Sequence, residues 1–271
     1  MATMLRPLSL SELLDRTFFL YRKHFILFVG IIAIPQLAVL GVQIGGAALR
    51  LRGSMIAAAL GTLVGVVVNL IALTASHAAT VMAVSDVHLE RPTSIGAAFA
   101  AIKGRLLGVM GIMFGVGLGI FIGLLLLIIP GIYLALAWSL AIPVTVLEGT
   151  GLNDTVTRSS FLTKGDRGRV FVIYLLLVIL EWVVMFIIQF PLLLVVGIIG
   201  IRDPVQAQGW MTIFSSIGAF LSTSLVGPLL TIGLTLIYYD ERVRKEGFDL
   251  QLMMATLQSS APNAMLATPT P

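Results

Sequence analysis

The longest uncharged stretch of the chain is LLGVMGIMFGVGLGIFIGLLLLIIPGIYLALAWSLAIPVTVL, residues 106–147. A helix needs about 20 apolar residues to cross the hydrocarbon core of a membrane, and this stretch is roughly twice that length. Pro130 and Gly131 lie near its middle, where proline removes a backbone donor and glycine tolerates a tight bend. The stretch therefore predicts two spans near 106–128 and 131–147, joined by a turn at Pro130-Gly131.

The rest of the chain contains further runs with few or no charges, each long enough for one span. They predict spans near 25–48, 56–84, 170–199 and 209–238. The composition agrees, because 58% of the residues are apolar and only 11% are charged, whereas soluble proteins average about 25% charged residues. A helix satisfies its own backbone hydrogen bonds in lipid. We therefore expect an all-α, polytopic membrane bundle of six transmembrane helices.

The charges indicate how these spans are oriented. Charged residues fill the first 24 positions, where the apolar core of a signal peptide would stand, so we expect the first span to be a retained anchor. Of the 17 Lys and Arg residues, only Arg50, Arg52 and Arg202 lie on the side opposite the N-terminus. The positive-inside rule therefore predicts that both termini face the cytoplasm. We expect one membrane domain over 1–250 and a disordered, Ser/Pro/Ala-rich tail at 251–271.

This orientation also explains the net charge of +4, because basic cytoplasmic loops face anionic lipid headgroups. Membrane lipids are the expected partners, with another membrane protein or a second copy of the chain as further candidates. No recognisable nucleic-acid motif occurs, so no nucleic-acid partner is expected.

Amphipathic segments precede the first, third and fifth spans. Apolar residues recur at helical spacing near 9–24 and 93–104, and a more polar stripe covers 153–164. Ser9 and Glu12 form a capping-box pattern at the first of them. Each segment is followed by two spans, and each second span ends at a carboxylate, which is Asp86, Glu148 or Asp240. The order predicts three repeats of amphipathic surface helix plus helical hairpin, although hairpins of this kind could also share these features independently.

Small and ionisable residues within the spans give two further signals. Gly111, Gly115, Gly119 and Gly123 form a ladder that favours close helix packing, against a helix of the same chain or of a second copy. Glu181 is the one charged residue inside a predicted span, roughly 18 Å of helix from Arg169. A carboxylate at that depth costs at least ~2.5 kcal/mol unless it is paired or protonated. The candidate intramembrane polar site is therefore Glu181, His77, Asn69 and Gln189, serving transport or only local hydrogen bonding.

The chain shows no motif of a known catalytic or cofactor site. It has no cysteine, no HExxH, no GxSxG, no P-loop and no dinucleotide fingerprint. The three histidines are too scattered for a recognisable zinc site. We therefore expect neither a catalytic residue nor a cofactor or metal.

Three stretches near the cytoplasmic edge carry a resemblance to a known family. They are Pro130-Gly131-Ile132-Tyr133 leading to Glu148-Gly149, Arg158–Gly165, and Tyr238–Arg242 running into Arg244–Asp249. In this order they resemble the membrane domain of bacterial glycerophosphoryl diester phosphodiesterases, in its stand-alone form. The resemblance implies a six-span bundle in a bacterial inner membrane. The family's catalytic barrel is a separate soluble module without a counterpart here, so the resemblance implies no phosphodiesterase activity.

These observations lead to three functional hypotheses. At the cytoplasmic edge, pairing of Arg158, Lys164 and Arg242 with Glu148 and Asp240 would fix the hairpins, or free arginines would hold lipid phosphate. The first hypothesis is a non-enzymatic scaffold, lipid-associated or partner-binding module. The alternatives are a small proton-linked carrier that uses Glu181, and a lipid-modifying membrane enzyme.

Overall fold

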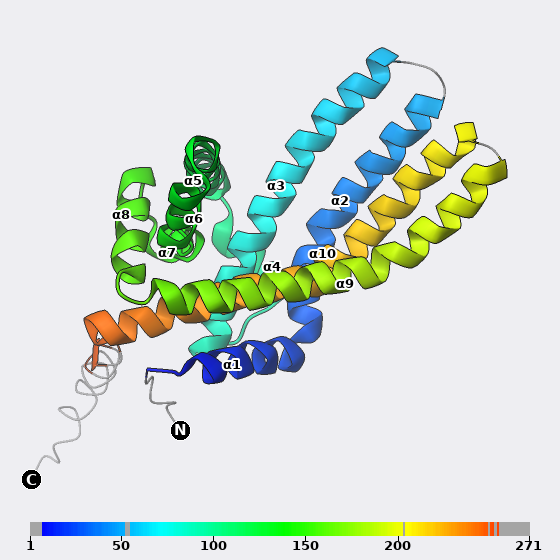
Figure 1. Cartoon of the computed structure of the whole chain (residues 1–271). Coiled ribbons are helices and arrows are strands. Elements are labelled where there is room, and N and C mark those ends of the chain that lie inside the picture. The colour runs from blue at the N-terminus through cyan, green and yellow to red at the C-terminus, as the bar shows by residue number, and fades with distance from the viewer. Residues whose placement is uncertain (1–6, 52–54, 203, 249, 252–253, 255–271) are drawn as a thin grey trace, which may run out of the picture.

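The computed structural model describes residues 7–51, 55–202, 204–248, 250–251 and 254 (Figure 1). These residues form α-helices and no strand, so the predicted all-α class is confirmed for the described part of the chain. The predicted tail at 251–271 lies almost wholly outside the described residues. The helices are α1 (Leu10–Lys23), α2 (Phe25–Leu51), α3 (Met55–His88), α4 (Ile95–Ile102), α5 (Leu106–Leu126), α6 (Ile128–Ala137), α7 (Ala141–Glu148), α8 (Leu152–Thr163), α9 (Arg167–Arg202) and α10 (Pro204–Glu246).

Six helical segments in the described part are long and apolar enough to cross a membrane, as expected of a multi-pass membrane protein. Five belong to α2, α3, α5, α9 and α10, and the sixth combines α6 and α7. Their bounds are Phe25–Leu49, Ala59–His88, Leu106–Leu126, Ile128–Glu148, Arg167–Ile198 and Trp210–Glu246.

The three short helices α1, α4 and α8 lie at one end of the bundle, which we call the charged end. The predicted capping box of α1 is present, since Glu12 N donates to Ser9 Oγ and Ser9 N donates to Glu12 Oε2. Ser94 caps α4, while α8 begins after Gly151. α4 packs chiefly on α3, and α8 packs on α7 and α6, which precede them in the chain. α1 packs chiefly on α10, the last membrane-spanning helix.

The hydrophobic core is concentrated near the charged end. Leu13 of α1, Phe28 of α2, Leu140 beside α7 and Ile237 of α10 are each at most 1% exposed. Away from this core, α2, α3, α9 and α10 extend together toward the opposite end, while α5 to α8 form a separate group beside them (Figure 1). The far halves of the long helices expose many large apolar side chains, as lipid-facing surfaces do.

The hairpin of the third and fourth spans turns earlier than the sequence indicates. α5 ends at Leu126, Leu127 is extended, and Pro130 and Gly131 lie in the first turn of α6. Proline is tolerated there because the first amide groups of a helix have no intrahelical acceptor. The fourth span is also not one helix, because α6 and α7 are separated by Trp138, Ser139 and Leu140.

The glycine ladder of α5 faces its own chain. A Cβ atom on Gly119 would lie 2.5 Å from the Trp138 ring, and one on Gly123 would lie 2.9 Å from Leu134. Gly115 faces Leu152 of α8, whereas Gly111 has nothing within 4 Å. Three of the four glycines thus let α5 approach α6 and α8 closely, and their packing partner is in the same chain.

Gly131→Ala is expected to destabilise the α5–α6 hairpin. The added Cβ would lie 2.5 Å from the backbone nitrogen of Leu124, so the two helices have to separate. Overpacking of this kind costs about 1–3 kcal/mol, part of which the better helix propensity of alanine offsets. The melting temperature of the purified protein in detergent should fall, while Gly111→Ala, which meets open space, should leave it unchanged or raise it. Equal melting temperatures for both variants would contradict this packing.

Candidate functional site

The interrupted fourth span leaves backbone groups without helical partners, and α8 supplies those partners. Ser159 Oγ donates to the carbonyl oxygen of Ala137 at 2.8 Å and accepts from Leu140 N at 3.2 Å. Thr163 Oγ1 lies 3.3 Å from the same Ala137 oxygen, and Ser159 and Thr163 are both fully buried. The polar stripe of α8 is therefore the face that completes a broken span.

The structure does not gather the four residues of the predicted intramembrane site. Glu181 is partly buried on α9, and no hydrogen bond or ion pair to it occurs among the described residues. Gln189 lies against Gly218 of α10, where a Cβ would be 3.0 Å from Gln189 Oε1. His77 and Asn69 are both on α3, but eight residues apart, about 12 Å of helix.

His77 lies in the interior of the bundle. Its Nδ1 forms a 2.7 Å hydrogen bond with Thr231 Oγ1 of α10. The ring also lines an apolar cavity of about 320 Å³ beside the break in the fourth span, with Trp138, Ser139 and Tyr174 on the other walls. The polar partner of His77 is therefore Thr231 rather than Glu181.

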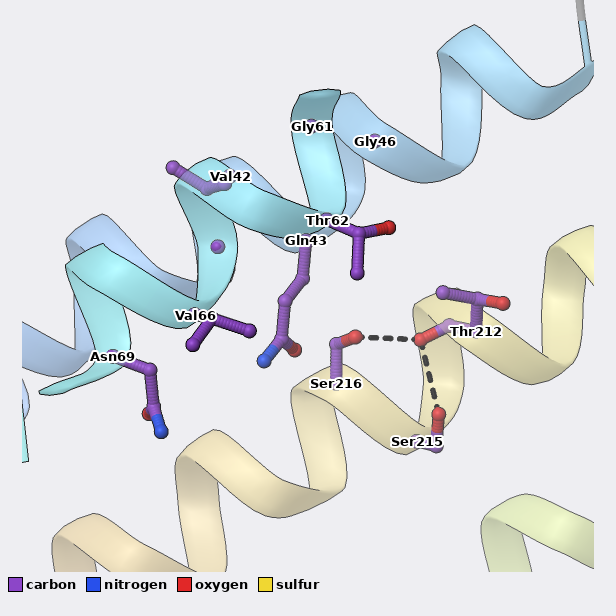
Figure 2. Close-up of a pocket in the computed structure, with 11 residues that line it drawn as sticks. Val42, Gln43, Gly46, Gly61, Thr62, Val66, Asn69, Thr212, Ser215 and Ser216 are labelled. Carbon is purple, nitrogen blue, oxygen red and sulfur yellow. Dashed lines mark hydrogen bonds between the residues drawn. The ribbon is translucent and has the colours of Figure 1, made fainter. Parts of the chain in front are cut away.

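Asn69 lines a different hollow, between α2, α3 and α10, together with Gln43 (Figure 2). Figure 2 shows both carboxamides extending toward α10, where Ser215 and Ser216 lie. All four residues belong to membrane-spanning segments. Sequence reasoning singled out Asn69 but not Gln43 as a site residue, because no spacing rule connects residues on two different helices.

At the charged end, five side chains from α7, α8 and α10 form a closed charge ring. Arg158 Nε lies 3.0 Å from Glu148 Oε2, and Arg158 Nη2 donates to Glu246 Oε2 at 2.9 Å. Arg242 Nε reaches the same Glu246 oxygen at 3.2 Å. Tyr238 closes the ring by donating to Glu148 Oε1 at 2.9 Å and accepting from Arg242 at 3.2 Å. The two carboxylates hold the pKa of Arg158 above its ordinary value.

Asp240 holds a second cluster, which fastens the segment before α1. It accepts from Arg169 Nη1 at 2.5 Å, from Arg244 Nε at 2.9 Å and from Leu8 N at 2.6 Å. Both arginines also donate to the carbonyl oxygen of Leu8 at 2.6 Å. The N-terminal segment is thereby tied to the last turns of α10, at the charged end of the bundle.

The partners of the predicted edge residues differ in part from the expected ones. Arg158 does face Glu148, but Arg242 binds Glu246 and Asp240 binds Arg169 and Arg244. Lys164 is exposed; its backbone oxygen accepts from Lys245 Nζ at 2.7 Å, and its side chain makes no ion pair among the described residues. Sequence reasoning missed Glu246 and Arg244, although both lie four residues after their partners on one helix, which is a readable spacing.

A groove beside α1 contrasts with these paired clusters. This α1 groove has a volume of about 710 Å³ and lies between α1, the end of α3 and the connection to α4. Its cations are Arg16, Lys23 and Arg91, and none of them has a carboxylate within ion-pair distance in the described part of the chain. Arg16 and Lys23 lie over the Phe19 ring, at 5.6 and 5.7 Å.

Two further side chains set the charge of the α1 groove. Partial burial and the neighbouring Lys23 lower the pKa of His24, which favours the uncharged ring. Glu90 is the one carboxylate among the lining residues. The groove therefore has a positive balance, and its shape and chemistry suit an anionic oxygen group.

Comparison with protein-family models, curated proteins and solved structures found no match to this chain. The family resemblance of the three edge stretches therefore stays a prediction, and the function has to be inferred from the contacts of the chain itself.

Proposed function

We propose that the protein is a non-enzymatic, multi-pass protein of a bacterial inner membrane that binds anionic phospholipid at its cytoplasmic face through the α1 groove. The observation that carries this proposal is the contrast in pairing at the charged end. Arg158, Arg169, Arg242 and Arg244 are each bound to carboxylates, whereas the cations of the α1 groove have no carboxylate partner among the described residues.

The charge distribution supports the cytoplasmic orientation in this proposal. The three short helices and the paired arginines lie at the same end as the segment preceding α1. Basic residues next to membrane spans are retained on the cytoplasmic side. Anionic lipid is enriched at that surface and attracts each nearby Lys or Arg by about 1 kcal/mol.

The side chains around the α1 groove fit a lipid rather than a soluble anion. Phe19 lies beside the cations and is 52% exposed, and Ile26 at the start of α2 is 80% exposed. An amphipathic helix at the interface buries such residues among acyl chains while its cations contact headgroups. A phosphodiester in the groove would bring its acyl chains next to Phe19.

The predicted three-repeat architecture is part of the proposal, and its support is the cyclic order of helix contacts. The second helices of the hairpins, α3, α7 and α10, contact one another. Each first helix packs on the hairpin before it in a cyclic order: α5 on α3, α9 on α6, and α2 on α10 of the last hairpin. The short helices do the same, with α4 on α3, α8 on α7 and α1 on α10. Glu148 and Asp240, which end two hairpins, bind Arg158 of α8 and Leu8 before α1 in that order.

The lipid proposal is tested with a triple variant, Arg16→Ala/Lys23→Ala/Arg91→Ala. At about 1 kcal/mol for each charge, its affinity for phosphatidylglycerol should fall roughly a hundredfold. Binding is measured by native mass spectrometry of the protein in detergent, titrated with phosphatidylglycerol and, separately, phosphatidylcholine.

A matched control removes three exposed cations outside the groove, Arg22→Ala/Lys103→Ala/Lys164→Ala, so that the net charge changes equally. This control should retain most of its affinity. Equal losses in the two triple variants, or equal binding of both lipids by the unmodified protein, would contradict a lipid site in the α1 groove.

A further inference from the structure

A second hollow lies toward the end of the bundle opposite the charged end, between α2, α3 and α10. Its volume is about 400 Å³, and its polar walls are formed by Gln43, Thr62, Asn69, Thr212, Ser215 and Ser216 (Figure 2). All of these residues lie within membrane-spanning segments. The hollow is therefore a polar space at a depth where the surroundings are lipid.

Glycines open this space. A Cβ on Gly61 would lie 3.7 Å from the Cα atom of Gly46, and one on Gly65 would lie 3.6 Å from Val42. α2 and α3 approach each other closely there, and the side chains of Gln43 on α2 and Asn69 on α3 extend toward α10 (Figure 2).

The hydrogen-bonding groups of the hollow are only partly used within the protein. The hydroxyls of Ser215 and Ser216 donate to the carbonyl oxygen of Thr212, at 3.1 and 2.6 Å, and keep their acceptor capacity. The carboxamides of Gln43 and Asn69 form no hydrogen bond with any described residue. Each carboxamide offers two donors and an acceptor.

Gln43 and Asn69 are both exposed on the protein, and leaving their carboxamides without partners in hydrocarbon would cost several kcal/mol. Their placement around one hollow therefore indicates that a hydrogen-bonding occupant fills it. The lining contains no acidic or basic side chain, so an ion would enter without a counter-charge, at a high desolvation cost. The occupant that matches these walls is uncharged and carries both donors and acceptors.

We propose that this hollow is a binding site for an uncharged polyhydroxyl group, reached from the membrane face opposite the charged end. Gln43 and Asn69 donate to and accept from its hydroxyls, and Ser215 and Ser216 accept from them. A free sugar and the sugar headgroup of a lipid share this chemistry. The site uses none of the residues of the α1 groove, so its test is independent of the test of the lipid proposal.

The test uses single cysteines, because the natural chain contains none. Val66→Cys lines the hollow but is not one of its proposed hydrogen-bonding residues. Val67→Cys is a control at a similar depth and exposure that is not part of the lining. Both are reacted in lipid nanodiscs with MTSET, a charged thiol reagent that reacts fast only in water. We expect Val66→Cys to react at least tenfold faster than Val67→Cys, and equal rates would overturn the proposal.

Protection from MTSET then identifies the occupant. Slowing of the Val66→Cys reaction by glucose supports a free solute, and slowing only by a monoglucosyl lipid in the nanodisc supports a headgroup. Labelling that neither compound slows would mean that the hollow holds water alone, which overturns the binding site. A binding assay on the cysteine-free protein, with radiolabelled glucose or glucosyl lipid, excludes an effect of the cysteine itself. The affinity should fall at least tenfold in Gln43→Leu and stay unchanged in Val67→Leu.

Discussion

Arg158→Ala should lower the free energy of unfolding by about 2–3 kcal/mol, the largest effect expected at the charged end. Arg158 is the cation shared by Glu148 and Glu246, and its removal leaves two carboxylates, each about one-fifth exposed, without that partner. Breaking a buried ion pair costs about 3–5 kcal/mol, and we reduce this value because the arginine side chain is 26% exposed. Chemical denaturation in mixed micelles measures the change.

Two further variants separate charge pairing from a general loss of charge. Lys103→Ala removes an exposed cation that has no ion pair among the described residues and should leave stability within about 0.5 kcal/mol of the original. Adding Glu148→Gln to Arg158→Ala should recover part of the loss, because Glu148 then carries no unpaired charge while Glu246 keeps its ion pair with Arg242. If Arg158→Ala unfolds at the same denaturant concentration as the unmodified protein, the charge ring does not hold α7, α8 and α10 together.

The second large effect is expected at the break in the fourth span. Ser159→Ala removes the hydroxyl that bonds both Ala137 O and Leu140 N, and Leu140 N then has no described acceptor. An unpaired buried backbone group costs about 1–3 kcal/mol, so we expect a loss of about 2–3 kcal/mol for the two bonds. The matched control is Ser160→Ala, whose hydroxyl forms no hydrogen bond with a described residue.

Hydrogen exchange gives this prediction a local readout. In Ser159→Ala the amide of Leu140 should exchange faster than in the unmodified protein and in Ser160→Ala. If Leu140 stays equally protected in all three, its protection does not come from α8.

The charge ring and the broken span mark different limits of sequence reasoning. Arg242 and Glu246 are four residues apart on one helix, so their pairing was accessible to a spacing rule even though it was not foreseen. Arg158 and Glu246, in contrast, are far apart in the chain and meet only because α8 packs beside the end of α10. Opposite charges in loops offer several alternative pairings, and only helix packing selects among them.

The break at Trp138–Leu140 has a sequence signal that hydropathy does not detect. Pro143, in the first turn of α7, has no amide hydrogen to donate to the carbonyl of Ser139, and its ring crowds that carbonyl. Proline alone does not decide the outcome, because Pro35, Pro191 and Pro228 lie inside continuous helices. At Pro143 the break is stabilised because the hydroxyl of Ser159, from a different helix, bonds Leu140 N and Ala137 O.

The sequence by itself determined the all-α class, the six apolar segments and the capping box of α1. Each depends on neighbouring residues alone: transfer of an apolar run into lipid, and a hydrogen bond between positions three residues apart. Only the tertiary structure decided which polar groups have partners. It separates Glu181, His77, Asn69 and Gln189, places Asn69 beside Gln43, and leaves the cations of the α1 groove without a described carboxylate. The physical reason is that the cost of an isolated polar group in a membrane depends on its three-dimensional neighbours, which packing between distant helices supplies.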